Sequence, residues 1–133
     1  MNTLFLHCRP GFEGEVCAEI TDLAARLDVP GYSRAKPGSA CAEFVCSEAA
    51  DSERLMRSVR FNQLIFPRQW ARGAFVSLPE SDRISVLLDA LADYPVCGSL
   101  WLEVVDTNDG KELSTFCKKF EAPLRKALLK AGK

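Results

Sequence analysis

The chain has 133 residues, of which 47% are hydrophobic and 26% are charged. This composition is ordinary for a soluble globular protein of one medium domain or two small ones, and no apolar run approaches the roughly 20 residues that cross a bilayer. The first residues lack a basic segment ahead of an apolar one, so we expect neither a signal peptide nor a membrane partner, and we expect a cytoplasmic protein.

The net charge of −1 hides an uneven distribution. Residues 1–110 contain ten Lys/Arg and sixteen Asp/Glu, a net charge of −6, whereas residues 111–133 contain seven Lys/Arg and two Glu, a net charge of +5. A basic segment attached to an acidic body favours an anionic partner, and nucleic acid is the first candidate.

The first part of the chain alternates strand and helix patterns. The predicted elements are a strand at 2–9, a helix at 13–28, strands at 32–35 and 40–46, a helix at 49–60, and a strand at 63–72 in which Pro67 could introduce a bulge. This order is that of a ferredoxin-like βαββαβ domain, which we assign to residues 1–75.

Residues 80–133 predict a helix, a strand and a second helix. Ser81 is the expected N-cap of the first helix, and residues 100–105 have the apolar pattern of a buried central strand. Pro123 should kink or restart the last helix, because its ring removes a backbone hydrogen bond. The last helix is expected to bury Leu113, Phe116, Cys117, Phe120 and Leu124. One strand with two helices cannot close a sheet, so we expect this α/β region to be incomplete.

Three stretches together resemble one known family. They are residues 102–125, which begin Leu-Glu-Val-Val-Asp-Thr-Asn-Asp-Gly-Lys, residues 8–13 (Cys-Arg-Pro-Gly-Phe-Glu) followed by residues 18–22, and residues 64–69 (Leu-Ile-Phe-Pro-Arg-Gln). The chain is similar to the amino-terminal part of the bacterial large-subunit ribosomal RNA 2′-O-ribose cytidine methyltransferases of the RlmM type. The resemblance runs through nearly the whole chain.

This resemblance implies an α+β chain in which the ferredoxin-like domain is followed by a partial THUMP domain at residues 80–133. THUMP modules are implied to bind RNA, here the large-subunit ribosomal RNA. The family would supply a Rossmann-like methyltransferase domain downstream, and S-adenosylmethionine would bind there. We therefore expect no cofactor and no catalysis in this chain alone.

The basic helix contributes most of the candidate RNA-binding residues. Its charged side chains avoid the apolar stripe, and clustered Lys/Arg bind phosphates because each neutralised phosphate releases counterions. The alternative is a solvated helix face whose cations complement the helix dipole. The candidates are Lys111, Lys118, Lys119, Arg125, Lys126 and Lys130.

A second candidate is the basic–aromatic run at the end of the first domain. In an unbulged strand, Arg68, Trp70 and Arg72 share one face, which suits stacking of an unpaired base. The favoured alternative is a tryptophan packed on the sheet under arginine stems.

Catalytic and metal-binding patterns are not apparent in this sequence. The six cysteines include no Cys-x-x-Cys pair, and we expect reduced thiols that pack as small apolar residues. His7 lies in a predicted strand without a nucleophile partner. Pro10 and Gly11 are interpreted as a steric strand–helix turn, and Glu13 and Glu15 would repel an anion from the start of the following helix.

Another class of function stays open. The chain could be a protein-interaction or regulatory ferredoxin-like module without RNA contact. The exposed edge of an unfinished sheet could then pair two copies into a dimer.

Overall fold

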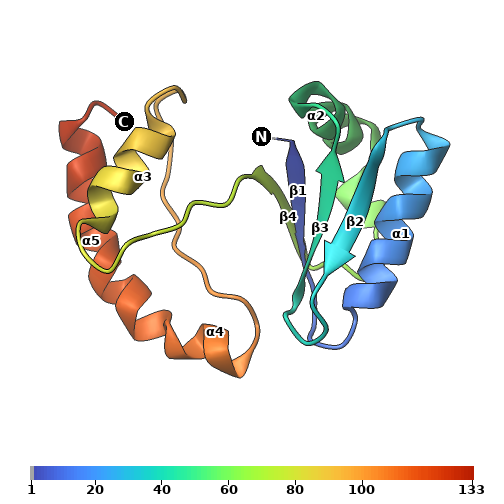
Figure 1. The fold of residues 1–133 in the computed structure, drawn as a ribbon, viewed down its shortest axis with the longest axis horizontal. Coiled ribbons are helices and arrows are strands. Elements are labelled where there is room, and N and C mark those ends of the chain that lie inside the picture. The colour runs from blue at the N-terminus through green and yellow to red at the C-terminus, as the bar shows by residue number, and fades with distance from the viewer. Residues whose placement is uncertain (1) are drawn as a thin grey trace. The chain divides into compact units, whose positions relative to one another are not determined.

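The computed structural model describes residues 2–133 and divides into two compact units (Figure 1). The first unit comprises the chain up to Ala74 together with Val105–Asn108, and the second comprises Phe75–Val104 with Asp109–Lys133.

The first unit is one antiparallel sheet with two helices on one face (Figure 1). The elements are β1 (Thr3–His7), α1 (Glu13–Arg26), β2 (Gly31–Ala35), β3 (Cys41–Cys46), α2 (Ala49–Ser58) and β4 (Gln69–Gly73). The strands pair in the order β2-β3-β1-β4, so β1 and β3 are central. This topology confirms the α+β, ferredoxin-like prediction.

The core lies between the sheet and its two helices. Leu4 and Leu6 of β1 stand opposite Phe44 and Ala42 of β3, and all four side chains are at most 1% exposed. Residues two apart in a strand lie on the same face of the sheet, and residues four apart in a helix lie on the same side of the helix. The buried strand residues and the buried Val16 and Ile20 of α1 therefore form one apolar layer. Each large side chain buried in this way contributes about 1.5–3 kcal/mol.

A buried carboxylate ties together two turns of the first unit. Glu13 is only 3% exposed, and its oxygens accept hydrogen bonds from the N–H groups of Gly11 at 2.7 Å and Ala40 at 3.3 Å. Burial alone would raise the pKa of Glu13, but backbone N–H groups, including those of Ala40, Gly11 and Gly38, outweigh it and lower the pKa. Glu13 thus connects the β1–α1 turn to the β2–β3 turn.

A second carboxylate of α1 fixes the loop before β4. Glu19 accepts hydrogen bonds from the consecutive N–H groups of Ile65 and Phe66, with its nearest oxygen 2.9 Å from the Ile65 nitrogen. Leu64 beside them is buried, so the loop is held by packing as well as by charge.

The sixth predicted element is shorter than expected. Residues 61–63 form a 3₁₀ turn, and sheet pairing in β4 begins only at Gln69. Pro67 has no N–H with which to join a ladder, and the first bond to β1 runs from the Arg68 N–H to the His7 carbonyl at 2.7 Å.

The second unit is helical over the residues described. Its helices are α3 (Arg83–Leu91), α4 (Asn108–Glu112) and α5 (Ser114–Lys130), although Asn108 itself groups with the first unit. Helices α3 and α5 pack side by side (Figure 1). No helix within residues 2–133 is long and apolar enough to cross a membrane.

The predicted strand at 100–105 is wrong. Residues 75–133 contain no strand, and Trp101 is 77% exposed. The alternating apolar pattern is present, but a strand needs a hydrogen-bonding neighbour, and no other extended segment of this unit supplies one. Residues 100–105 therefore do not form the unfinished sheet edge that could pair two copies, and dimerisation itself stays a prediction.

The ends of the helices also differ from expectation. Asp82 rather than Ser81 precedes α3, in a left-handed conformation with φ 54° and no side-chain cap bond. The last helix restarts at Leu113, between α4 and α5, and continues unbroken through Pro123. Because Leu113 lies at this break, its side chain is 56% exposed instead of buried, and Phe116 is 38% exposed.

We expect Glu13→Gln to destabilise the first unit by about 1–3 kcal/mol at pH 7, because the new NH₂ group would leave buried backbone donors without an acceptor. Urea unfolding followed by Trp70 fluorescence in a Trp101→Phe background reports this unit alone. The matched control is Glu15→Gln, an exposed residue in the same helical turn, which should change stability by less than about 0.5 kcal/mol.

The effect of Glu13 has a defined pH window. The pKa is lower in the folded state, so the stabilisation is fully present above the ordinary glutamate value of about 4.3 and disappears as pH falls through the lowered value. The difference between wild type and Glu13→Gln should therefore shrink below about pH 4. A difference that is constant with pH would show that the charge of Glu13 is not involved.

Candidate nucleic-acid interface

The basic side chains of α5 form one exposed face. At about 100° per residue, Lys118, Lys119, Arg125, Lys126 and Lys130 fall within an arc of about 140°. All five are exposed, whereas Leu124 and Leu128 on the opposite side are 3% and 4% exposed. We call these five residues the α5 basic face. The predicted separation of charge from the buried stripe is confirmed.

A shallow groove runs along this face. It is lined by Lys118, Glu121, Ala122, Arg125, Lys126 and Leu129. Arg125 donates to Glu121 at 2.7 Å, an i,i+4 ion pair between half-exposed side chains that contributes little to stability. Lys118 and Lys126 lie two helical turns apart, about 12 Å along the axis, and both remain exposed.

Contacts within the second unit fix the helix that carries this face. The Arg83 guanidinium of α3 lies 5.0 Å from the ring centre of Phe116, which stacks on Phe120 at 5.2 Å. The ammonium of Lys133 donates to the carbonyls of Ala92, at 2.9 Å, and Tyr94. Lys133 therefore completes the end of α3, although it belongs to the same basic segment of the sequence.

Lys111 lies apart from the α5 basic face. It is an exposed residue of the short helix α4, on the other side of the break at Leu113. It stays a predicted RNA contact on charge alone.

The structure does not assemble Arg68, Trp70 and Arg72 into an open stacking face. Trp70 is half-buried against the core and lies 5.6 Å from the ring of Phe61. Arg72 donates through Nε to the hydroxyl of Ser52 at 3.0 Å and through Nη2 to the Ala49 carbonyl. Arg72 thus joins β4 to α2 and Trp70 packs on the core, which agrees with the packing alternative. Their RNA contact stays a prediction without geometric support.

Arg68 has a different setting. Its side chain is 58% exposed and forms an ion pair with Asp106 at 3.1 Å. It also lines a pocket of the first unit with Arg9, Phe12 and Phe66, none of which the sequence indicated as binding residues. The pattern Arg9-Pro10-Gly11-Phe12 could have indicated it, since the turn brings an arginine and an aromatic ring together.

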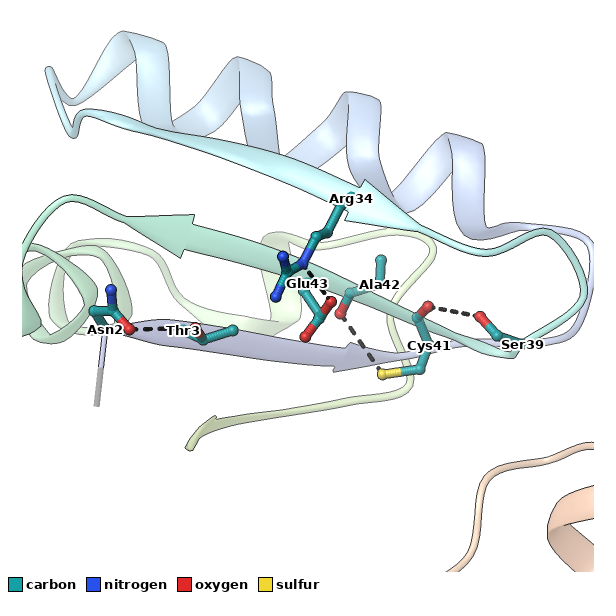
Figure 2. A network of polar contacts seen from close by, with 7 residues as sticks. All are labelled: Asn2, Thr3, Arg34, Ser39, Cys41, Ala42 and Glu43. Carbon is teal, nitrogen blue, oxygen red and sulfur yellow. Dashed lines mark hydrogen bonds and ion pairs between the residues drawn. The ribbon is translucent and has the colours of Figure 1, made fainter. Parts of the chain in front are cut away.

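The face of the sheet away from the helices carries a polar pair. Figure 2 shows Arg34 of β2 directed toward Glu43 of β3, with 2.8 Å between Nε and Oε2. The ion pair adds a side-chain link to the pairing of β2 and β3. The ion pair offsets the positive charge of Arg34, so this face attracts an anion less strongly than the α5 basic face does.

The cysteines and carboxylates of the described residues do not form a metal site or a disulfide. No group of three or more ligand residues occurs within residues 2–133, and all six cysteines are free thiols. Burial, followed by the charge of Glu13, raises the pKa of Cys8 to about 11, so this thiol stays protonated at neutral pH and is a poor nucleophile.

Together these features define an α+β chain with a ferredoxin-like unit and a helical unit bearing a basic face. Sequence profiles place it more narrowly: that of the RlmM ferredoxin-like domain matches residues 1–71, and that of the ribosomal RNA large subunit methyltransferase M amino-terminal region matches residues 82–133. The chain belongs to the RlmM family.

Curated relatives agree with this assignment. Over all 133 residues the chain is 96% identical to a "Ribosomal RNA large subunit methyltransferase M" of Ectopseudomonas mendocina (strain ymp), and it covers 38% of that protein. Proteins of the same name from Pseudomonas putida (strain GB-1) and Pseudomonas syringae pv. syringae (strain B728a) are 76% and 75% identical over the whole chain. The chain spans 38% and 37% of their lengths.

We expect Arg72→Met to destabilise the first unit by about 1–2 kcal/mol, because it leaves the Ser52 hydroxyl and the Ala49 carbonyl without this donor. Trp70 fluorescence during urea unfolding measures the effect, again in the Trp101→Phe background. Arg26→Met, whose side chain is 71% exposed, is the control and should leave the midpoint almost unchanged. Equal stability of both variants would contradict a structural role for Arg72.

Proposed function

We propose that this chain is the RNA-binding, substrate-positioning amino-terminal region of an S-adenosylmethionine-dependent methyltransferase. Its substrate would be the 2′-hydroxyl of a cytidine in the large-subunit ribosomal RNA. The observation that carries the proposal is the α5 basic face, which is exposed and opposite the buried stripe. Membership of the RlmM family, and the name of its relatives, support ribosomal RNA as the substrate and methyl transfer as the reaction.

The role of the α5 basic face is to fix the orientation of the RNA. Phosphate contacts position a nucleic acid without reading its sequence, and they gain free energy by releasing condensed counterions. Folded RNA presents its phosphates and 2′-hydroxyls while its deep groove is closed to side chains, so an exposed basic helix face suits recognition by shape.

Methyl transfer belongs to another part of the enzyme in this proposal. Rossmann-like domains bind their cofactor in the crevice outside the carboxyl ends of parallel strands, whereas the described sheet is antiparallel with both helices on one face. The sheet of the described residues therefore does not form the kind of crevice in which a Rossmann-like domain binds its cofactor. The partial THUMP domain at 80–133 and a downstream catalytic domain remain parts of the proposal.

The charge-reversed variant Lys118→Glu plus Lys119→Glu should bind a labelled fragment of large-subunit ribosomal RNA more weakly than the wild-type chain. Fluorescence anisotropy across a salt series measures both affinity and the dependence of log K on log salt. Each phosphate contact contributes about 0.7–0.9 to that slope, so the double variant should lose roughly 1–2 units of slope.

Lys36→Glu plus Arg60→Glu is the matched control, because it makes the same change of charge at exposed residues of the first unit. Equal losses of RNA affinity in the two double variants would show that only net charge matters, and they would contradict a specific role for α5. A wild-type chain that binds a protein but no RNA would favour the alternative interaction module, whose mainly apolar contact should depend weakly on salt.

The chain alone should transfer no methyl group from S-adenosylmethionine to ribosomal RNA. Incorporation of labelled methyl above a no-protein background would contradict the assignment of catalysis to a downstream domain.

A further inference from the structure

The first unit contains a pocket that the α5 basic face does not involve. It lies where β1 leads into α1, beside the loop before β4. Its lining residues are Arg9, Phe12, Ile65, Phe66, Pro67 and Arg68.

The pocket presents an aromatic surface to solvent. Phe12 and Phe66 stack with ring centres 6.0 Å apart and planes inclined by 25°. Phe66 packs against the core, but Phe12 is 43% exposed, so the stack has an uncovered outer ring. An exposed aromatic face of this kind can stack an unpaired base of any type.

Two planar cations flank the aromatic pair. Arg9 is exposed, and its guanidinium has no hydrogen-bond or ion-pair partner among residues 2–133. Arg68 uses a single guanidinium nitrogen for Asp106. Guanidinium planes stack on bases and donate hydrogen bonds to base edges, so the arginines and the phenylalanines suit the same ligand.

Both loops of the pocket are fixed before any ligand arrives. Glu13 accepts the Gly11 N–H and so holds the turn that carries Arg9 and Phe12. Glu19 accepts the N–H groups of Ile65 and Phe66. Preformed geometry reduces the entropy lost when a ligand binds.

The carboxylates near the pocket favour binding of the base of a nucleotide over its phosphate. Asp106 pairs with Arg68, while Glu13 and Glu19 accept hydrogen bonds from the two loops that line the pocket. These three carboxylates oppose the binding of a phosphate, but they do not oppose an uncharged base.

We propose that this pocket holds an unpaired base of the bound RNA, stacked on Phe12 and flanked by Arg9 and Arg68. The inference rests on the proposed function, because it presupposes that the chain binds RNA. It adds base recognition by the first unit to the phosphate contacts of α5.

The test compares two RNA probes, a short labelled oligouridine and the same backbone carrying abasic sites. Phe12→Ala should weaken oligouridine binding about 5- to 100-fold, the range that one base–aromatic stack supplies. It should leave abasic binding unchanged. The slope of log K against log salt should also stay unchanged, because stacking displaces no counterions.

Phe12→Trp, which keeps an aromatic face, should retain oligouridine binding. Tyr32→Ala removes a ring outside the pocket that is 55% exposed, and as a control it should leave binding of both probes unchanged. Equal weakening of both probes by Phe12→Ala would mean a purely structural effect and would overturn the inference. Salt-sensitive RNA binding that is indifferent to Phe12 would overturn it while the proposed function stands. A wild-type chain that binds neither these probes nor ribosomal RNA would overturn both.

Discussion

Two carboxylates of α1 hold the loops on which the first unit depends. Glu13 connects the β1–α1 turn to the β2–β3 turn, and Glu19 fixes the loop before β4. Backbone N–H groups in such turns have no partner within a sheet or helix, so a carboxylate acceptor stabilises them, and the effect is largest for the buried Glu13. The same hydrogen bonds place Phe12 and Phe66 together, and the pocket follows from the packing of the fold.

The two units would offer RNA different kinds of contact. The second unit carries exposed lysines on a face opposite Leu124 and Leu128. The first unit has almost balanced charge, with nine Lys/Arg and ten Asp/Glu, and carries an aromatic stack beside two arginines. Phosphate attraction is strong and indifferent to sequence, whereas stacking is short-ranged and requires an unpaired base. The proposed role of positioning a folded substrate for another domain would use both kinds of contact.

Local periodicity predicted most of the first unit, because each strand there has a neighbouring strand that completes its backbone hydrogen bonds. The same reasoning failed at residues 100–105, where an equally clear pattern finds no strand to pair with. The α5 basic face could be predicted, since helical spacing alone determines which side chains share a face. The contact of Arg72 with Ser52 could not, because those residues meet only through the tertiary fold. Glu13 was interpreted as a group repelling anions, and its role as a buried acceptor depends on Ala40, which is distant in the sequence.

RNA binding by the α5 basic face is tested most directly by mapping amide chemical-shift changes in the isotope-labelled chain as ribosomal RNA is added. We expect the largest changes between residues 118 and 130, together with a second group at Phe12 and Phe66. Binding with changes confined to β2 and β3, and with α5 unaffected, would contradict it.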